Sequence, residues 1–308
     1  MVTLKQFFAA AAIRHSFGSS DTKRDAGQTT PADIIRFDNI LYGDDRRLKK
    51  WQLLDVYRPR AYGEGQGSSL KKLPVIISVH GGAWVYGDKD RYQFYCMRLA
   101  QRGFAVVNYS YRLAPEAKFP ASVEDTEKVF QWVCQNAQVY GFDTSNVFAV
   151  GDSAGGHLLT MYASAITNAD FGATFPFIKP KDMNLRGVAL NCGKYSIEPS
   201  DSQMKMLLGG LMPHGGTDEE LALLNAASHI TKDFPPAFVM TCYGDFLQEE
   251  APVAIKALQT AGVKCESHVY GSPEKLLWHV FHCDPKLPEA VVCNDDECNF
   301  FKSLIVAE

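Results

Sequence analysis

A serine with the surroundings of a nucleophile lies in the segment Gly151-Asp152-Ser153-Ala154-Gly155, which has the spacing G-x-S-x-G. The segment follows a predicted strand and precedes a predicted helix, the context in which this spacing produces a reactive serine. The turn between the two elements strains the backbone of Ser153 and exposes its hydroxyl at a helix N-terminus, where N–H groups favour negative charge. We therefore predict that Ser153 attacks an acyl carbon.

Backbone donors for such a reaction are predicted in His80-Gly81-Gly82-Ala83-Trp84, at the end of another strand. Adjacent glycines let a backbone approach a substrate without obstruction by a Cβ atom, and a tetrahedral intermediate needs N–H groups about 3 Å from its oxygen. We expect the N–H groups of Gly82, Ala83 and Ala154 to form this oxyanion hole, while Gly81 shapes the loop. His80 is expected to orient the loop by hydrogen bonds.

An acid and a histidine must follow Ser153 in the chain order that this motif has in its usual fold. Asp245 follows a predicted strand at 236–242, and a carboxylate at the carboxyl end of a strand faces the site crevice. A cap for the next helix is the other interpretation of Asp245. Glu249 and Glu250 compete with it, but they begin a helix, where acidic side chains are common.

The elements that must position these residues alternate along the chain. Apolar runs predict strands, and helical spacing predicts helices between them. This alternation indicates an α/β fold with a mostly parallel central sheet that is flanked by helices on both faces. The predicted strands are 51–59, 73–80, 104–110, 146–151, 185–191, 236–242 and 265–271, and the predicted helices are 89–102, 122–141, 154–168, 249–261 and 290–306.

Two segments do not fit the alternation. Residues 1–47 are helical at first and then polar, and residues 193–230 contain glycine pairs and short helical pieces between two core strands. The methionines and leucines of the second segment favour a covering role. The alternative is that residues 193–230 form a packed surface segment without a functional role.

The composition is that of an ordinary globular protein, with 46% hydrophobic and 21% charged residues in 308. The formal net charge of −4 argues against a nucleic-acid binder. No run of 18 apolar residues is present, so we expect no membrane span, and the short run at 7–13 makes a poor signal peptide. We expect a cytoplasmic protein whose eight cysteines are reduced.

Further motifs make the chain resemble a known family over about residues 50–305. They are Tyr111-Arg112-Leu113-Ala114-Pro115-Glu116, and Phe234-Pro235-Pro236-Ala237 leading to Gly244-Asp245-Phe246-Leu247. With the two glycine motifs they resemble the hormone-sensitive-lipase-like esterases of the α/β-hydrolase fold. One departure is Ala83, which stands where that family has a third glycine.

The resemblance implies a serine carboxylesterase that hydrolyses short-chain acyl esters and needs no metal or organic cofactor. The family has a histidine, one variable residue and a phenylalanine near its C-terminal end, which His279-Val280-Phe281 matches. The implied triad is therefore Ser153, Asp245 and His279, with His282 at the surface or beside the site. The resemblance also implies a small helical cap, in which an N-terminal segment (1–47) and an insertion near 193–230 cover the catalytic domain (48–308).

Alternatives to this function remain open. Trp84 and Tyr86 are expected to bind substrate, and such aromatic residues would suit acetyl or feruloyl esters of plant carbohydrates, although aromatic residues are more often core. A non-catalytic binding protein of the same fold is a third possibility, against which the intact triad speaks. The expected partner is a small ester, with neither nucleic acid nor membrane, and a homodimer is possible.

Overall fold

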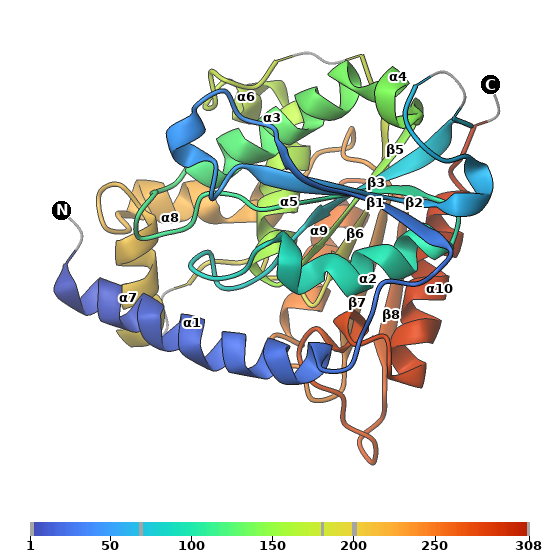
Figure 1. The fold of residues 1–308 in the computed structure, drawn as a ribbon. Coiled ribbons are helices and arrows are strands. Elements are labelled where there is room, and N and C mark those ends of the chain that lie inside the picture. The colour runs from blue at the N-terminus through green and yellow to red at the C-terminus, as the bar shows by residue number, and fades with distance from the viewer. Residues whose placement is uncertain (1–2, 68–69, 180–181, 199–201, 307–308) are drawn as a thin grey trace.

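The computed structural model describes residues 3–67, 70–179, 182–198 and 202–306 of the chain. Their strands form a single eight-stranded sheet in the order β1-β2-β4-β3-β5-β6-β7-β8 (Figure 1). β1 and β2 pair antiparallel, as do β2 and β4, and all other pairs are parallel. The strands are β1 (Ile34–Leu41), β2 (Leu53–Pro59), β3 (Leu73–Val79), β4 (Ala105–Tyr109), β5 (Phe142–Asp152), β6 (Leu185–Asn191), β7 (Ala237–Cys242) and β8 (Cys265–Tyr270).

Helices cover both faces of this sheet, which confirms the predicted α/β fold. In the described residues they are α1 (Leu4–Asp25), α2 (Lys89–Gln101), α3 (Ala121–Gln135), α4 (Ala137–Tyr140), α5 (Ala154–Thr167), α6 (Ala169–Gly172), α7 (Ser202–Leu211), α8 (Asp218–Leu224), α9 (Glu250–Thr260) and α10 (Pro288–Lys302). The predicted helix 122–141 is divided into α3 and α4 at Asn136.

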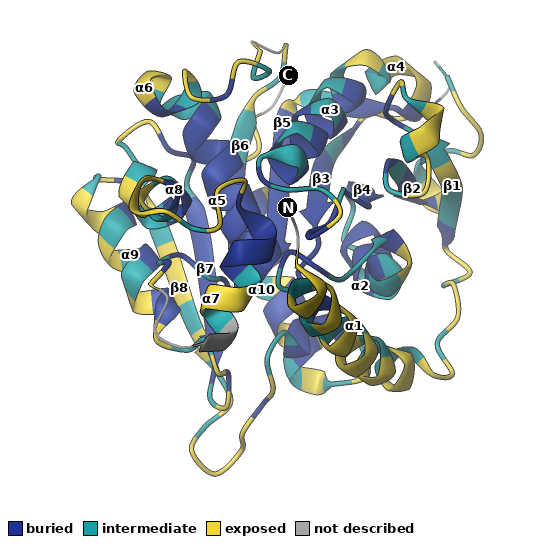
Figure 2. Ribbon diagram, turned by 90° about the vertical axis from the view of Figure 1, so that its left-hand side faces the viewer, coloured by how far each residue is buried: buried dark blue, intermediate teal, exposed yellow. Residues whose placement is uncertain are grey.

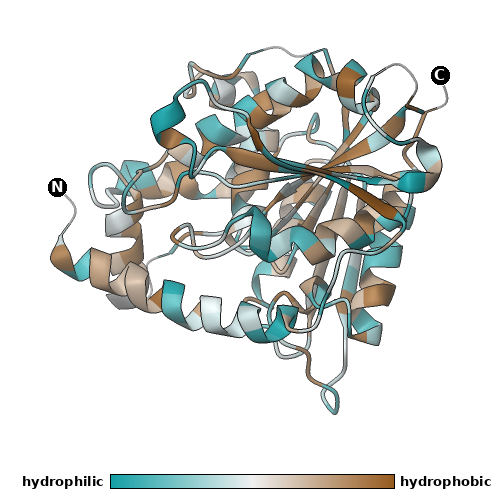
Figure 3. Ribbon diagram, in the orientation of Figure 1, coloured by the Kyte–Doolittle hydropathy of each residue, from teal (hydrophilic) through white to brown (hydrophobic). Residues whose placement is uncertain are grey.

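The hydrophobic core has two halves, one on each side of the sheet. Val75 and Ile77 of β3 pack toward α3, α5 and α9, whereas Ile76 packs toward α2 and α10. This alternation follows from the two-residue repeat of a strand. Figure 2 shows the central strands and α5 as buried, and Figure 3 shows the same strands as the most hydrophobic part of the fold.

The parallel strands bring the predicted site residues to one edge of the sheet. The glycine-rich loop 80–87 follows β3, Ser153 follows β5, and Asp245 follows β7, while His279 lies in the loop after β8. Carboxyl ends of neighbouring parallel strands meet at the same edge, which is where ligands bind in open α/β sheets.

The N-terminal segment differs from the prediction in one respect. Its first part, α1, lies outside the sheet and rests against α7 (Figures 1 and 2). Residues 34–41 instead form the edge strand β1, which was not predicted. The insertion at 193–230 contains α7 and α8, and its residues 199–201 lie outside the described part of the chain. In the described residues, no helix is long and apolar enough to cross a bilayer.

Candidate active site

Ser153 is the turn residue between β5 and α5, and its backbone is strained. Its φ of 52° and ψ of −121° lie in a region that residues with a Cβ atom rarely adopt. A Cβ atom on Gly155 would lie 2.1 Å from the carbonyl oxygen of Val79, so the turn closes only with glycine there. The strand–turn–helix geometry that the sequence motif predicted is therefore present.

The backbone of Ser153 is also tied to the end of β6. Its N–H donates to the carbonyl of Asn191 at 3.1 Å, and its own carbonyl accepts from the N–H of Lys194 at 3.2 Å. Ala154 is the first residue of α5, and the first N–H groups of a helix have no partner within it. The N–H of Ala154 therefore lies at the N-terminus of α5, directly after Ser153.

Asp245 and His279 form a hydrogen-bonded pair, with 2.7 Å between Asp245 Oδ1 and His279 Nδ1. The Asp245 carboxylate also accepts from the N–H of Leu247 at 2.9 Å and from the Thr241 hydroxyl at 3.0 Å. Burial raises the pKa of Asp245, but the bond to His279 and the other donors outweigh it, so that the net pKa is lowered. The carboxylate therefore stays ionised and holds the imidazole in one orientation.

The two competing acids, Glu249 and Glu250, have other surroundings than Asp245. Glu250 accepts from the N–H groups of Tyr195 and Ser196, both at 2.9 Å, and forms an ion pair with Lys194. Glu249 is exposed. Thus Glu250 stabilises the turn after β6.

His282 is fully buried, so of its two expected positions the surface one is wrong and the one beside the site remains. Its ring lies edge-on to Tyr95 with centroids 5.0 Å apart, and its Nε2 is 3.5 Å from the Cys283 thiol. Burial lowers the pKa of His282 to about 3, so the ring is neutral. It belongs to the packing behind the site.

The glycine-rich loop has an unusual backbone at three successive residues. Gly82, Ala83 and Trp84 have φ values of 119°, 53° and 60°. The N–H of Gly81 donates to the Tyr92 hydroxyl at 3.0 Å, and that hydroxyl donates to Asp152 Oδ2 at 2.7 Å. Gly81 is thereby occupied in shaping the loop. Ala83 reaches the left-handed conformation although it has a Cβ atom.

A cavity of about 460 Å³ lies at this edge of the sheet and contains both Ser153 and His279. Gly82 and Tyr86 also line it. Trp84 is not among its lining residues: the indole is buried, and its N–H donates to His157 Nδ1 at 3.2 Å. The structure thus places Tyr86 in the cavity and Trp84 in the core beneath it.

Several lining residues were not singled out from the sequence. From the loops after β7 and β8 come Phe246 and Trp278, whose side chains are 72% and 49% exposed and form an aromatic rim. From α1 come Phe17, Ser20, Asp21 and Arg24. The α1 residues have no local sequence signal, because their position depends on how the helix docks.

Arg14 docks α1 beside the cavity. Its guanidinium donates twice to Glu116 at 2.7 Å, and also to the backbone carbonyls of Ala114 and Val85. Further along the helix, Asp21 accepts from the Tyr86 hydroxyl at 2.8 Å. The N-terminal helix is therefore bonded to the loop after β3 and to the loop after β4.

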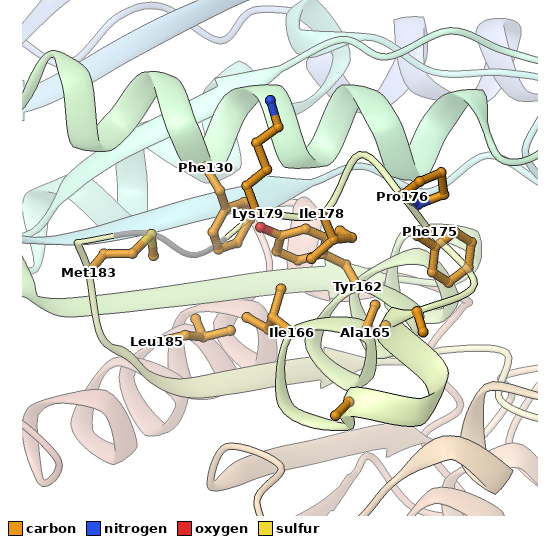
Figure 4. A pocket seen from close by; sticks show the side chains of 13 residues that line it. Phe130, Tyr162, Ala165, Ile166, Phe175, Pro176, Ile178, Lys179, Met183 and Leu185 are labelled. Carbon is orange, nitrogen blue, oxygen red and sulfur yellow. The ribbon is translucent and has the colours of Figure 1, made fainter.

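A second, larger cavity of about 550 Å³ lies beside α5 and α6, away from this edge (Figure 4). Phe130, Tyr162, Ile178 and other apolar side chains line it, and Lys179 points out of it in the close-up. None of the predicted triad residues is among its lining.

Within the described part of the chain, two groups of side chains have the donor atoms of a metal site within 4.8 Å of one another: Asp152 with His282 and Cys283, and Asp245 with His279 and Cys192. In each group two members already share a hydrogen bond.

Comparison with known proteins places the chain among esterases. The BD-FAE family model matches residues 54–247. Versiconal hemiacetal acetate esterase from Dothistroma septosporum is 29% identical over 236 residues, which cover 71% of this chain and 70% of that protein. Esterase LipC from Mycobacterium tuberculosis is 29% identical over 209 residues, which are 65% of this chain but only 49% of LipC.

Solved structures share the fold over nearly the whole chain. Esterase B from Lactobacillus rhamnosis, with a tributyrin phosphonate inhibitor, superposes with a TM-score of 0.85 at 25% identity and covers 97% of this chain and 95% of that one. An esterase from Pyrobaculum calidifontis has a TM-score of 0.73, also at 25% identity, over 97% of this chain and 94% of that one.

Proposed function

The chain belongs to the BD-FAE family, and from this premise we propose that it is a serine carboxylesterase with the triad Ser153, His279 and Asp245. The resemblance to α/β-hydrolase esterases that the motifs indicated is confirmed, and the ester-hydrolase class follows from the similar esterases. The choice of triad residues and the preference for short acyl chains are our proposal.

Acylation begins at Ser153. Its Oγ attacks the ester carbonyl while His279 takes the hydroxyl proton as general base, and Asp245 holds the imidazole through Nδ1. The N–H groups of Gly82, Ala83 and Ala154 stabilise the negative oxygen of the tetrahedral intermediate. The intermediate collapses, the bond to the alcohol breaks, and His279 returns the proton to the leaving alkoxide.

Deacylation repeats these steps with water. His279 removes a proton from water, whose oxygen attacks the acyl-enzyme carbonyl, and the same oxyanion hole stabilises the second intermediate. Collapse releases the carboxylic acid and returns the proton to Ser153 Oγ.

One observation carries the proposal: a cavity contains both Ser153, whose backbone is strained at a strand–helix turn, and a histidine bonded to a buried carboxylate. A serine and a histidine that belonged only to the core would not require this strained turn beside a shared cavity. The cavity volume of about 460 Å³ suits a small ester. The inhibitor in the esterase B structure is a tributyrin phosphonate, which supports short acyl groups here.

The test is a series of chromogenic esters from acetyl to decanoyl, assayed with the wild type and with Ser153→Ala. We expect turnover to be highest for short chains and to fall by several orders of magnitude in the variant. Full activity of Ser153→Ala would overturn the triad, and a maximum at decanoyl would overturn the preference for short chains.

A second candidate is favoured by the aromatic side chains that line the cavity, which are Phe17, Tyr86, Phe246 and Trp278. Flat rings stack well on such side chains, so a feruloyl ester is the alternative substrate class. Methyl ferulate and acetylated xylan, assayed beside the acyl series, separate the two: a higher kcat/KM for methyl ferulate than for any short-chain ester would favour the aromatic acid.

A further inference from the structure

We propose that His157 is a positioning residue, which fixes the oxyanion-hole donors of the loop after β3 relative to Ser153. It does so through a hydrogen bond to the indole of Trp84. This inference rests on the proposed triad and oxyanion hole and adds a residue behind them. No sequence motif assigns a role to His157, which precedes the acid of the triad in the chain and so cannot be its histidine.

The proposed oxyanion hole combines donors from two segments. Gly82 and Ala83 belong to the loop after β3, whereas Ala154 is the first residue of α5. Donors from separate segments stabilise one oxygen only if the segments keep a fixed distance from each other. His157 lies in the first turn of α5, and its backbone N–H donates to the Ser153 carbonyl at 3.1 Å. The helix therefore fixes the backbone of His157 relative to the nucleophile.

The imidazole of His157 joins this helix to the loop. Its Nδ1 accepts from the Trp84 indole N–H at 3.2 Å, and the two rings meet edge to face with their centroids 5.2 Å apart. Both side chains are buried. Since Trp84 directly follows Ala83, the bond connects the loop donors with the helix that begins beside Ser153.

The second ring nitrogen gives the imidazole one orientation. An indole N–H can only donate, so Nδ1 of His157 accepts and the ring proton is on Nε2. Nε2 donates to the Leu224 carbonyl at 2.8 Å, at the end of α8, where the last carbonyls of a helix have no partner within it. Burial lowers the pKa of His157 to about 4, so the ring is neutral and Nδ1 remains an acceptor at neutral pH.

The backbone of the loop needs such a restraint. Ala83 and Trp84 are both left-handed, with φ values of 53° and 60°, and strain of this kind persists where the surroundings enforce it. The Trp84 carbonyl accepts from the N–H of Ala114 at 2.9 Å, while its indole is bonded to His157. Backbone and side-chain bonds of Trp84 therefore define the conformation on which the position of the Ala83 N–H depends.

Substitutions on both sides of the bond test the proposal. Trp84→Phe removes the donor and keeps an aromatic ring. His157→Gln can still donate to the Leu224 carbonyl but has no acceptor at the place of Nδ1, whereas His157→Asn has an amide oxygen near that place. Trp132→Phe is the matched control, because Trp132 is a buried indole on α3 that packs on Tyr140 and does not line the cavity.

The first measurement is steady-state kinetics with a short-chain ester. Loss of a whole oxyanion donor costs about 10²- to 10³-fold in kcat, so we expect displaced donors to cost about 5- to 50-fold in Trp84→Phe and His157→Gln, with KM changed less than about twofold. His157→Asn should retain most of kcat, and Trp132→Phe should retain all of it. Combining Trp84→Phe with His157→Gln should lower kcat no further than either alone, since both break one bond.

The second measurement reports on the oxyanion hole without turnover. In a short-chain trifluoromethyl ketone, Ser153 Oγ bonds to the carbonyl carbon, its proton passes to His279, and the ketone oxygen becomes the oxyanion of a stable adduct. We expect the inhibition constant to rise in Trp84→Phe and His157→Gln by about the factor by which kcat falls, and to stay unchanged in Trp132→Phe. Urea unfolding of each variant establishes that it is folded.

A folded Trp84→Phe protein with the wild-type kcat and inhibition constant would overturn the positioning role. Equal losses in His157→Asn and His157→Gln would also overturn it, because the acceptor at Nδ1 would then be irrelevant. If Trp84→Phe does not fold, the two His157 variants alone decide the question. A wild type that neither hydrolyses an ester nor binds the ketone would instead contradict the proposed function.

Discussion

At the scale of single residues, the acid of the proposed triad is the least obvious from the sequence, because three carboxylates lie within six residues. The structure separates them: Asp245 is bonded to His279, Glu250 to the turn at 194–196, and Glu249 is exposed. Of the three, Asp245 is the one bonded to an imidazole, as our proposed triad requires.

Asp245→Asn should therefore lower kcat by about 10²- to 10⁴-fold with little change in KM, because the amide holds the wrong tautomer of His279. Steady-state kinetics measure both constants. Glu249→Gln is the control and should retain wild-type activity. Equal losses in the two variants would show that Asp245 is not the triad acid.

Ala83 is a residue at which stability and activity should separate. A φ of 53° raises the free energy of a residue with a Cβ atom, but not that of glycine. Ala83→Gly should stabilise the fold by about 1 kcal/mol after the greater freedom of glycine in the unfolded chain is subtracted. It should also retain kcat, since glycine keeps the N–H. Urea unfolding checks the first expectation, and destabilisation would mean that the Ala83 methyl group contributes packing greater than the strain.

At the scale of elements, helix α1 forms one wall of the cavity. The local sequence pattern alone cannot predict where this helix docks. Its position rests on Arg14, which contacts Glu116 and two carbonyls of the neighbouring loops. Within residues 1–47, β1 belongs to the sheet, so the proposal of a cap concerns α1 alone. That α1, α7 and α8 act together as a cap remains our proposal.

Arg14→Ala should raise KM by about 3- to 10-fold and change kcat less than twofold, because α1 contributes Phe17, Asp21 and Arg24 to the cavity but no group to the chemistry. Kinetics with a short-chain ester test this. The control is Arg47→Ala, which removes an exposed ion pair with Asp45 far along the chain from the site. A KM equal to that of the control would argue that α1 does not shape the substrate site.

The C-terminal helix α10 docks on the sheet through a buried acid. Glu297 is fully buried and accepts from Tyr95 at 3.0 Å and Asn191 at 2.6 Å. Burial raises the pKa of Glu297 to about 7, although these hydrogen bonds oppose the shift. A folded-state pKa above the unfolded value means that the group favours folding at low pH, and that this contribution is lost as the pH rises through the folded pKa.

Glu297→Gln should therefore become more stable relative to the wild type as the pH rises from 4.5 to 8, by an amount on the order of 1–3 kcal/mol. Unfolding by urea at pH 5 and pH 8 gives the comparison. A difference between the two proteins that is the same at both pH values would show that Glu297 is not protonated on folding.

At the scale of the whole molecule, the strands of the parallel sheet were predictable and its antiparallel edge was not. Strands buried on both faces appear as continuous apolar runs, as at 73–79 and 185–191, where the structure agrees with the prediction within a residue. β1 mixes polar and apolar residues and has an irregular register between Phe37 and Ile40, so it lacked that signal.

The site was predictable as far as motifs determine local geometry. Ser153 and the loop after β3 occur where the glycines indicated, and Asp245 and His279 meet because parallel strands end at one edge. Trp84 was expected to face substrate, but successive left-handed residues turn its side chain into the core. The contribution of α1 depends on contacts between distant segments, which one sequence does not reveal.

The most direct test of the account is to locate the covalent adduct of a short-chain alkyl phosphonate ester by mass spectrometry, in the wild type and in Ser153→Ala. The phosphorus takes the place of the ester carbonyl carbon, so only an activated nucleophile bonds to it. We predict one adduct, on the peptide that contains Ser153, and none in the variant. An adduct on another residue, or none in the wild type, would contradict the assignment of Ser153 as the nucleophile.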